Sequence, residues 1–325
     1  MMKIAINGFG RIGRIFLRQA VKEKDMEIVA INDLADKDNL IYLAERDSVY
    51  GKFKFPDTEI KFLSEKDPSK LPWKELSVDV VVEASGVFTS YEKAKPHLDA
   101  GAKRVVLTAP ASKDDENTAT FTPNIGEKNA EKCVITSNAS CTTNCVAPVA
   151  AIMAENPGIE KAILNTVHAY TATQSIVDGP AKKDFTRGRA GAINVGPSHT
   201  GAAAATGKVL PELDGKFDGV AVRVPVPCGS LVDFTFLAKK KTSVEEINNI
   251  FREAAKKPEW QGILKISEEP LVSTDIIAEP YASIVDLSFT RVVDGDLVKI
   301  FSWYDNEWGY CSMLIKHIKT LEKLL

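Results

Sequence analysis

The sequence lacks any apolar run long enough to cross a membrane. Its first residues, "MMKIAINGFG", contain no basic segment followed by an uninterrupted apolar stretch and a small-residue cleavage site, so we expect no secretory signal. Cysteine is scarce: the five cysteines, an odd number, do not suit a disulfide framework and favour a reducing compartment. These absences predict a cytoplasmic protein without a membrane partner.

Charge of either sign is not in excess. Lys and Arg (41) nearly cancel Asp and Glu (44) in a chain of 325 residues, and the two signs are interspersed. The net charge of −3 excludes a surface built mainly for nucleic acid or for an anionic membrane. Recognition of phosphate groups must therefore be local, and we expect no dedicated nucleic-acid site.

The first half of the chain alternates short β-rich apolar runs with helical patterns. Strand-like runs such as "KIAING", "EIVAIND" and "KRVVLTAP" are separated by stretches such as "RIGRIFLRQAVKEK". Val80, Val81 and Val82 are apolar on both faces, as in the strands of a parallel sheet that is covered on both sides. This pattern predicts an α/β cofactor domain with a Rossmann-type, doubly wound and mostly parallel sheet.

The second half has longer strands that alternate apolar and polar residues. They include "KAILNTVHAYT" and "SIVDLSFTRVVDGDLVKIFSWYD", and the hairpin signal Asp294-Gly295 lies within the latter. We therefore expect an α+β catalytic domain with a largely antiparallel sheet. Residues 177–197 form the longest stretch without a clear period, and loops of that length are usually functional or disordered. A closing helix should bury one face, formed by Tyr310, Leu314, Ile318, Leu321 and Leu325.

Three glycines, Gly8, Gly10 and Gly13, form a G-x-G-x-x-G motif between a predicted strand and a predicted helix. Glycines there let the backbone approach a pyrophosphate at a helix N-terminus, where amide donors favour an anion. Asp33 ends the next strand, 20 residues after Gly13, where a carboxylate can bind the ribose hydroxyls. Alternatively, the glycines only form turns and Asp33 only ends a strand. The order of strand, glycine turn, helix and acid along the sequence favours a dinucleotide site instead.

The segment "SNASCTTNC" places Cys141 and Cys145 four residues apart, which raises the alternatives of a metal site, a disulfide and a nucleophile. Zinc needs about four ligands, and the sequence has no second cysteine pair or paired histidines, so we expect no metal. Cys141 directly precedes a helical pattern, whose amides and dipole should lower its pKa and favour the thiolate. The usual fate of a lone cysteine, a buried inert thiol, is expected for Cys133, Cys145, Cys228 and Cys311.

A thiolate nucleophile needs a base within hydrogen-bond reach, and the sequence has four histidines. His168 lies in a strand among polar residues, although a lone histidine there is more often a satisfied core residue. His97 and His317 lie in helical patterns with charged neighbours and are expected on solvated faces. His199, in a stretch rich in Gly and Ala, is ambiguous.

Arginines and hydroxyls near these segments suggest a phosphate site, since guanidinium, hydroxyl and backbone amide are its usual components. The candidates are Arg187, Arg189 and Arg223. Arg223 interrupts the alternation of "VAVRVPV", so the sequence leaves open whether it points inward or to solvent.

Six motifs, "INGFGRIGR", "SNASCTTNC", "NTVHAYTATQ", "GRAGAINVGPSHTGAA", "VRVPVP" and "SWYDNEWGY", together carry a resemblance. With them the chain resembles phosphorylating glyceraldehyde-3-phosphate dehydrogenases from residue 3 to about residue 311. The resemblance implies NAD-dependent oxidative phosphorylation of D-glyceraldehyde 3-phosphate to 1,3-bisphosphoglycerate in glycolysis or gluconeogenesis, through a cysteine thiohemiacetal and a thioester. It implies an NAD-binding domain over residues 1–140, completed by a helix over 305–325, and a catalytic domain over 141–304. It also implies a homotetramer, with residues 177–197 at a subunit interface.

The resemblance also implies roles for single residues. Cys141 is the implied nucleophile and His168, 27 residues on, is its base. The implied ligands of the substrate phosphate are Thr171 and Arg223, and those of inorganic phosphate are Ser140, Thr142, Arg189, Thr200 and Gly201. The implied cofactor contacts are Gly8, Gly10, Arg11, Ile12, Gly13, Asp33, Ser85, Gly86, Thr108 and Asn306.

The chain departs from the family pattern in a few places. Residues 52–66 are shorter than is common, His199 stands beside Thr200, Cys311 replaces a common Ser, and Cys228 is expected at a surface or subunit contact. Two alternatives remain open. Erythrose-4-phosphate dehydrogenase shares the fold and the Cys/His pair but favours thioester hydrolysis over phosphorolysis. An RNA-binding role in the cofactor groove has little support at a net charge of −3.

Overall fold

The structure is a computed structural model that describes residues 1–112, 114–115, 117–181 and 184–324, so Lys182, Lys183 and Leu325 lie outside the described residues. The chain forms two compact units. Unit 1 contains Met1–Ser140 and Cys311–Leu325, and unit 2 contains Cys141–Tyr310. Within the described ranges, no helix is both long enough and apolar enough to span a membrane.

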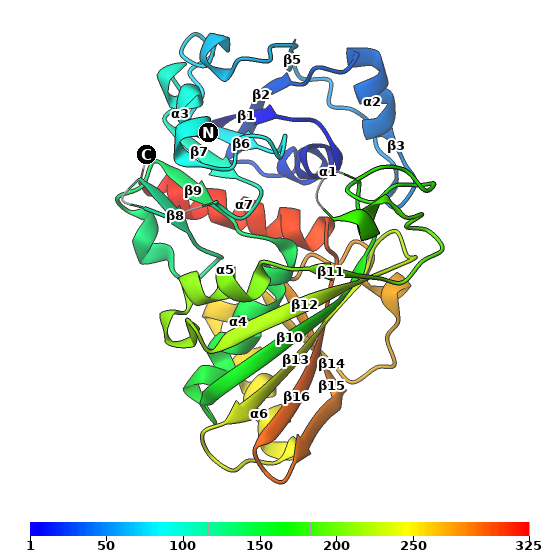
Figure 1. The fold of residues 1–325 in the computed structure, drawn as a ribbon. Helices are drawn as coiled ribbons and strands as arrows, with labels where there is room; N and C mark the ends of the chain where they lie inside the picture. Colours follow the sequence, from blue (N-terminus) through cyan, green and yellow to red (C-terminus); the bar gives the residue numbers. More distant parts are fainter. Residues whose placement is uncertain (113, 116, 182–183, 325) are drawn as a thin grey trace. The chain divides into compact units, whose positions relative to one another are not determined.

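Unit 1 is built on a parallel sheet, in which the described residues form seven strands. The strands, in their order across the sheet, are β5 (Lys61–Leu63), β2 (Met26–Asn32), β1 (Met2–Asn7), β6 (Val80–Glu83), β7 (Arg104–Leu107), β9 (Ile135–Ser137) and β8 (Thr118–Thr120). The chain order reverses between β1 and β6, which pair directly in the middle of the sheet (Figure 1). All four residues of β6 are buried, as the run of valines predicted. The predicted doubly wound parallel sheet is confirmed.

Helices complete unit 1, and their ends follow from local capping. They are α1 (Arg11–Ala20), α2 (Lys37–Glu45), α3 (Tyr91–Asp99) and α7 (Trp308–Glu322), with the short 3-10 helices η1 (Pro68–Lys70) and η2 (Glu127–Ala130) and the small hairpin β3 (Arg46–Asp47) and β4 (Gly51–Lys52). The carboxylate of Asp36 caps α2 and the hydroxyl of Ser90 caps α3. In α7 the predicted apolar face is confirmed, because Tyr310, Leu314, Ile318 and Leu321 are buried.

Unit 2 contains a second, mostly antiparallel sheet, again of seven strands among the described residues. In their order across the sheet they are β11 (Gly196–His199), β12 (Phe217–Val224), β10 (Ile159–Ala169), β13 (Ser230–Ala238), β16 (Leu297–Tyr304), β15 (Ser283–Val293) and β14 (Leu264–Ser267). Only the pairs β10 with β12 and β14 with β15 are parallel within the described sheet. Asp294 and Gly295 have φ angles of 48° and 75° in the turn between β15 and β16, so the predicted hairpin is confirmed.

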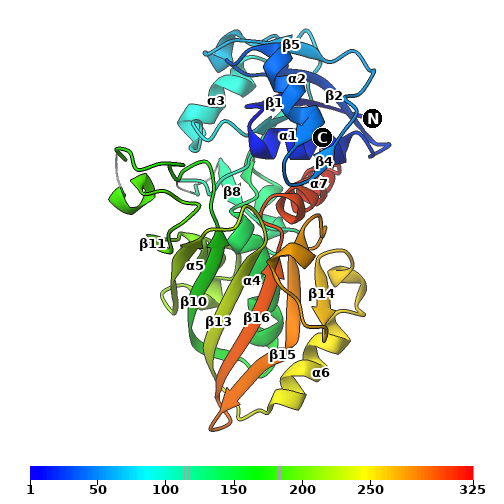
Figure 2. The ribbon, with the colours of Figure 1, turned by 90° about the vertical axis from the view of Figure 1, so that its right-hand side faces the viewer.

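Helices cover one face of this second sheet, whose long strands lie side by side in Figure 2. They are α4 (Cys141–Glu155), α5 (Ala202–Val209) and α6 (Val244–Ala254). Unit 2 also contains the 3-10 helices η3 (Phe185–Gly188), η4 (Pro211–Leu213), η5 (Pro258–Trp260) and η6 (Ser273–Ile276). Residues of β13 alternate strictly between buried and half-buried, because only one face of the strand meets these helices. The core of unit 2 therefore lies between the sheet and α4, α5 and α6.

The prediction that His97 and His317 lie on solvated faces is wrong. Both side chains are fully buried. On α3 the charged neighbours Lys95 and Asp99 form an exposed ion pair, while the helical period turns His97 inward. The ring of His317 stacks on Phe121 with ring centroids 3.7 Å apart. Charged neighbours in the sequence did not reveal these inward positions, because successive helical residues face different sides.

Among the five cysteines, Cys133, Cys145, Cys228 and Cys311 are buried, as predicted for inert thiols. The further expectation that Cys228 lies at a surface is wrong, because this residue is only 2% exposed. Its Sγ donates to Oδ1 of Asp305 at 3.1 Å. The buried carboxylate thus accepts a hydrogen bond from the thiol, which satisfies the polar S–H group of Cys228 inside the protein.

Candidate functional site

The glycine-rich turn joins β1 to α1 and is sterically closed to larger residues. Gly8 has a φ of +94°, and a Cβ there would lie 2.4 Å from the backbone nitrogen of Ser85. A Cβ at Gly13 would lie 2.3 Å from the carbonyl oxygen of Gly8. Gly10 is the N-terminal cap residue of α1, and no side chain occupies the cap. The turn therefore leaves the first amide groups of α1 accessible to an anion.

A pocket of about 540 Å³ lies at this turn, at the carboxyl ends of β1, β2 and β6, where the strand order reverses. Open α/β sheets bind dinucleotides at such a point, and the volume lies within the usual range for ligand pockets. The residues that line it are Asn7, Gly8, Gly10, Asn32, Asp33, Leu34, Glu65, Lys66, Ala84, Ser85, Val87 and Phe88. An acid, helix amides and exposed apolar side chains together suit a pyrophosphate, a ribose and an adenine ring.

Asp33 follows β2 and is partly exposed beside this pocket. Its Oδ2 accepts from the backbone nitrogen of Phe9 at 2.7 Å, and its Oδ1 accepts from that of Ala35 at 2.9 Å. These two bonds fix the carboxylate at the pocket edge, where lone pairs remain for a ribose hydroxyl. Lys66 also lines the pocket, so the lining contains a basic side chain as well as the carboxylate of Asp33.

The other predicted cofactor residues of unit 1 differ in their contacts and in their positions in the fold. The guanidinium of Arg11 pairs with Asp47, so its backbone amide at the start of α1 is what it offers to a ligand. Thr108 donates from both its backbone nitrogen and its hydroxyl to the carbonyl oxygen of Glu83, each at 3.0 Å. Ile12 is partly buried in the first turn of α1, and Gly86 has a φ of +74°.

A buried carboxylate, Glu83, supports the turn and was missed by the sequence prediction. It accepts from Asn7 Nδ2 and from the backbone nitrogen and hydroxyl of Ser85. Trp73 Nε1 donates to His97 Nδ1 at 3.0 Å, which leaves the ring proton on Nε2 to donate to Glu83 at 3.1 Å. We call these five residues the Glu83 network. It ties together the loops after β1 and β6 that line the pocket.

In unit 2, Cys141 is the first residue of α4, and its Sγ lies 3.4 Å from Nε2 of His168. His168 is the second-last residue of β10 and is buried, whereas Cys141 is the one partly exposed cysteine of the five. The sequence predicted this pair, and the structure brings the two side chains together. Cys145, one helical turn on, is buried, and desolvation raises its pKa to about 12.

The predicted lowering of the Cys141 pKa is wrong for the protein alone. Desolvation raises this pKa and outweighs the charge of Arg223 and the hydrogen bonds at Thr142, which lower it. For His168, desolvation first and the charge of Arg223 second lower the pKa to about 3. Burial therefore disfavours the charged form of each of the two groups taken singly.

Arg223 points at His168, which answers the question that strand alternation left open. The two residues are direct neighbours across the parallel strands β10 and β12. Arg223 Nη1 lies 2.7 Å from Nδ1 of His168 and donates to the carbonyl oxygen of Ala169 at 3.0 Å. Its Nε is buried and has no hydrogen-bond partner among the described residues. The Nε proton is therefore an unsatisfied donor inside the protein.

Hydroxyl groups gather in the segment after β10. The backbone nitrogen of Thr171 donates to Gln174, and its hydroxyl lies 2.9 Å from that of Thr173. Arg187 donates to the Thr173 hydroxyl at 3.1 Å. Arg189, in contrast, is mostly exposed and pairs with Asp178 at 2.9 Å. Arg187 is thus the arginine of this segment that contacts the hydroxyls.

The remaining predicted site residues lie in unit 2, and several of them form hydrogen-bond contacts with nearby residues. The Thr142 hydroxyl lies 2.9 Å from that of the buried Tyr304, and Asn306 Oδ1 accepts from Ser230 at 3.0 Å. Tyr304 and Ser230 were missed by the sequence prediction. Ser140 is partly exposed before α4, and Gly201 caps α5 after Thr200, whose hydroxyl accepts from the Ala202 amide at 3.2 Å.

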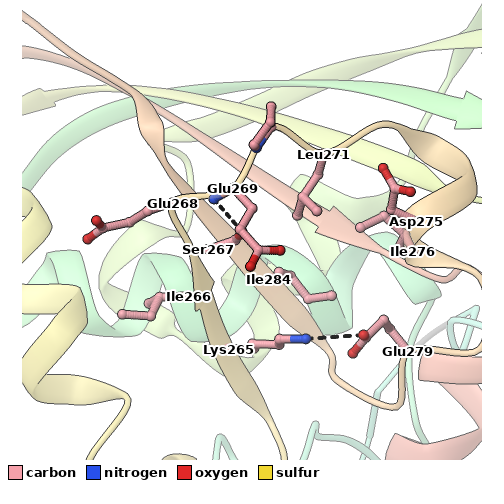
Figure 3. Close-up of a pocket in the computed structure, with 11 residues that line it drawn as sticks. Lys265, Ile266, Ser267, Glu268, Glu269, Leu271, Asp275, Ile276, Glu279 and Ile284 are labelled. Carbon is pink, nitrogen blue, oxygen red and sulfur yellow. Dashed lines mark hydrogen bonds and ion pairs between the residues drawn. The ribbon is translucent and has the colours of Figure 1, made fainter.

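A further pocket of about 680 Å³ lies beside β14 in unit 2 (Figure 3). Its charged side chains are mostly acidic, and Lys265 pairs with Glu279 at 3.1 Å. The lining contains none of the predicted site residues. Its carboxylates suit an anionic ligand poorly.

Comparison with known proteins gives matches along most of the chain. Residues 2–91 match the family model of the glyceraldehyde 3-phosphate dehydrogenase NAD binding domain, and residues 140–306 match that of its C-terminal domain. A glyceraldehyde-3-phosphate dehydrogenase of Mycolicibacterium smegmatis is 45% identical, covering 100% of this chain and 99% of that protein. Glyceraldehyde-3-phosphate dehydrogenase 1 of Streptomyces arenae is 46% identical, covering 97% of this chain and 96% of that protein. The chain therefore belongs to the glyceraldehyde 3-phosphate dehydrogenase family, with NAD as its cofactor.

Proposed function

We propose that the chain catalyses the NAD-dependent oxidative phosphorylation of D-glyceraldehyde 3-phosphate to 1,3-bisphosphoglycerate, in glycolysis or gluconeogenesis. The observation that carries the proposal is the distance of 3.4 Å between Cys141 Sγ and His168 Nε2 at the start of α4. A nucleophile beside a base, at a helix N-terminus, is the arrangement that acyl transfer requires.

In this reaction His168 accepts the thiol proton at Nε2 as Cys141 adds to the aldehyde carbonyl, and returns it to the carbonyl oxygen, which gives a hemithioacetal. His168 accepts the hydroxyl proton at Nε2, and oxidation leaves a thioester on Cys141. Inorganic phosphate attacks the thioester, releases the acyl phosphate and restores the thiolate. NAD, when bound, supplies the hydride acceptor. The amide of Cys141 stabilises the developing oxyanion, an effect of about 3–4 kcal/mol for one good donor.

Unit 1 would hold NAD through the glycine turn and the carboxylate of Asp33. Steric closure at Gly8 and Gly13, and the pocket at the strand-order reversal, support this assignment. The residues proposed to contact NAD are Gly8, Gly10, Arg11, Ile12, Gly13, Asp33, Ser85, Gly86 and Thr108 in unit 1, and Asn306 in unit 2.

Two anion sites are needed, because substrate phosphate and inorganic phosphate are present together. We assign the first to Thr171 and Arg223, and the neighbouring hydroxyls of Thr171 and Thr173, 2.9 Å apart, support this role. We assign the second to Ser140, Thr142, Arg189, Thr200 and Gly201. The Thr142 hydroxyl contacts Tyr304, and its backbone amide hydrogen-bonds the sulfur of Cys141, so this residue would have to rearrange its contacts to bind phosphate.

We further propose that residues 1–140 with 305–325 form the NAD-binding domain, that residues 141–304 form the catalytic domain, and that the protein is a cytoplasmic homotetramer. Exposed apolar side chains in the long loop of unit 2 support association. These are Ile176, Val177, Phe185, Ile193 and Val195, each at least 66% exposed. A monomer rarely exposes so many apolar side chains in one segment.

The test is NADH formation from glyceraldehyde 3-phosphate with and without inorganic phosphate. We expect turnover that requires phosphate. Phosphate-independent turnover would instead favour thioester hydrolysis, the chemistry of the erythrose-4-phosphate dehydrogenases. Absence of NADH formation under both conditions would contradict the proposal.

A further inference from the structure

Three adjacent parallel strands of unit 1 end in polar residues that lie side by side. Asn32 is the last residue of β2, Asn7 of β1 and Glu83 of β6. Asn7 pairs in register with both Asn32 and Glu83. Registered neighbours in parallel strands direct their side chains to the same face of the sheet. All three side chains are buried, at most 5% exposed, so their polar atoms need partners inside the protein.

The three side chains form one continuous chain of hydrogen bonds. Asn7 donates from Nδ2 to Oε2 of Glu83 at 2.5 Å, and its Oδ1 accepts from Asn32 Nδ2 at 2.7 Å. Asn32 Nδ2 also donates to the carbonyl oxygen of Glu65, and Asn32 Oδ1 accepts from the backbone nitrogen of Glu65, each at 2.9 Å. Glu65 follows β5, the next strand of the sheet. The hydrogen-bond chain thus crosses four strands, from Glu83 to the backbone of Glu65.

The direction of this hydrogen-bond chain is fixed at both of its ends. At one end the backbone N–H and carbonyl of Glu65 orient the amide group of Asn32. At the other end the carboxylate of Glu83 accepts at Oε1 from the backbone nitrogen and hydroxyl of Ser85, and at Oε2 from Asn7. Because a carboxylate only accepts, Asn7 turns Nδ2 to Glu83 and Oδ1 to Asn32. Both ends therefore require the same orientation of the two amide groups.

The hydrogen-bond chain joins the walls of the pocket at the glycine turn. Four of the residues that it connects line this pocket, namely Asn7, Asn32, Glu65 and Ser85. Glu83 is not part of the lining among the described residues, so it can act on a ligand only through these neighbours. One wall belongs to the loop after β6 and another to the segment after β5, on either side of β1 and β2. The buried carboxylate thus links two walls that come from separate strands.

We propose that Glu83 is a positioning residue for NAD. Through Asn7 and Asn32, its carboxylate holds the loop after β6 and the segment after β5 at the spacing that the cofactor needs. This inference rests on the proposed function, because it takes the pocket at the glycine turn as the NAD site. It goes beyond that proposal by assigning part of the affinity for NAD to a residue that does not touch it.

Glu83→Gln tests the carboxylate at nearly constant size. Whichever way the new amide group is turned, its N–H faces another donor. In one orientation it meets the backbone N–H of Ser85, and in the other it meets Nδ2 of Asn7. The hydrogen-bond chain therefore cannot be satisfied with glutamine at this position, and the two walls should loosen.

The first measurement is the Kd for NAD of the full-length variant, by isothermal titration calorimetry. We expect Glu83→Gln to raise Kd at least about tenfold, because binding must then order walls that are ordered beforehand in the wild type. The value of kcat at saturating NAD should stay within a few fold, since Glu83 belongs to unit 1 and the reacting residues belong to unit 2. An unchanged Kd overturns the inference.

Asp79→Asn is the matched control. Asp79 joins the same two strands at their opposite ends, because its Oδ2 accepts from the backbone nitrogen of Lys3 at 2.8 Å. The substitution also removes a charge, which pairs with Lys103 at 2.7 Å, and Asp79 is outside the lining of the pocket. Its Kd for NAD should equal that of the wild type. An equal rise of Kd in both variants would indicate a general loss of stability and would overturn the inference.

Hydrogen exchange followed by mass spectrometry tests whether the effect crosses the sheet. In Glu83→Gln the backbone amide of Glu65, which donates to Asn32, should exchange at least about tenfold faster than in the wild type. In Asp79→Asn it should not. A raised Kd with unchanged exchange at Glu65 would mean that Glu83 acts only on the adjacent Ser85, and it would overturn the proposed link between the walls.

Failure of the inference is distinguishable from failure of the proposed function. Equal NAD binding by the wild type and Glu83→Gln overturns the inference alone, whereas a wild type that does not bind NAD overturns the proposed function. If Glu83→Gln does not fold, Asn32→Ala breaks the hydrogen-bond chain from its other side. The backbone amide of Ser85, two strands away, should then exchange faster. Unchanged exchange at Ser85 overturns the inference.

Discussion

His97 in unit 1 and His168 in unit 2 are both buried, 0% and 4% exposed, and both have partners at each ring nitrogen. At His97 a donor, Trp73, meets Nδ1 at 3.0 Å and an acceptor, Glu83, meets Nε2 at 3.1 Å, while the amide of Asn7 lies farther from Nε2, at 3.5 Å, so a single tautomer satisfies the two shorter contacts. At His168 a donor, Arg223, and an acceptor, the carbonyl of Ala169, meet the same nitrogen, Nδ1. Burial therefore does not distinguish a structural histidine from a reactive one. What distinguishes them is whether one tautomer of the ring can satisfy the close partners at both nitrogens.

The largest effect is expected at the partner of the reactive histidine. Cys141→Ser should abolish turnover and leave NAD binding nearly intact, because a hydroxyl is a far weaker nucleophile at neutral pH. Steady-state kinetics and NAD titration measure the two effects. Cys145→Ser is the matched control, and it should cost far less because that thiol is buried with a pKa of about 12. Labelling of Cys145 or Cys228 by iodoacetate, with Cys141 spared, would contradict the assignment.

Substituting both histidines by Asn compares them directly. His168→Asn should lower kcat by roughly 10² to 10⁴, the range for a lost acid-base group. His97→Asn should leave kcat within a few fold, but should destabilise unit 1 by about 1–3 kcal/mol because Glu83 loses a donor. Stopped-flow kinetics and urea unfolding measure the two effects. A kcat loss at His97 as large as that at His168 would remove the distinction between them.

Cofactor choice should depend on unit 1, through Asp33. Its carboxylate meets a 2′-phosphate with like charge, so kcat/KM for NAD should exceed that for NADP by at least roughly tenfold. Asp33→Ala with Pro180→Ser should narrow the ratio, chiefly by improving NADP. Kinetics with both cofactors measure it. Equal efficiency in the wild type would indicate that a basic side chain compensates, and Lys66→Ala tests the one that lines the pocket.

The smallest expected effect is on the pH dependence of the free energy of unfolding, and it arises from a third buried histidine, His317. Desolvation lowers its pKa to about 3, so below about pH 6.5 the unfolded chain binds a proton that the folded chain does not. The free energy of unfolding should therefore fall as the pH drops from 6.5 towards 3, by at most about 1.4 kcal/mol per pH unit for this residue. His317→Gln should flatten that slope in urea unfolding between pH 5 and 7. The exposed His199→Gln should not, and an equal slope in both variants would refute the assignment.

The sequence was sufficient for features that depend on short segments. The glycine turn, the run of buried valines in β6, the Asp294-Gly295 hairpin and the pair of Cys141 and His168 follow from local pattern or from family motifs. The Glu83 network did not, because its members lie in β1, β6, α3 and the segments beside them, and only the fold brings them together.

Arg223 shows a second limit. Strand alternation gives two faces but does not say which face meets which neighbour. The pairing of β10 with β12 places Arg223 opposite His168, and that pairing is parallel in a sheet where antiparallel pairs prevail. Partners across strands far apart in the chain are therefore the information that this sequence did not supply on its own.

The glycine turn has a consequence for protein engineering. Gly8 and Gly13 leave no room for a Cβ, but a Cβ at Gly10 would meet no atom within 4 Å. Libraries that aim at non-natural cofactors can therefore vary position 10 without steric damage to the scaffold. Because Gly10 also lines the pocket, each added side-chain atom there would reduce the space for a dinucleotide. Position 10 thus offers a route to a smaller cofactor, while positions 8 and 13 must keep glycine.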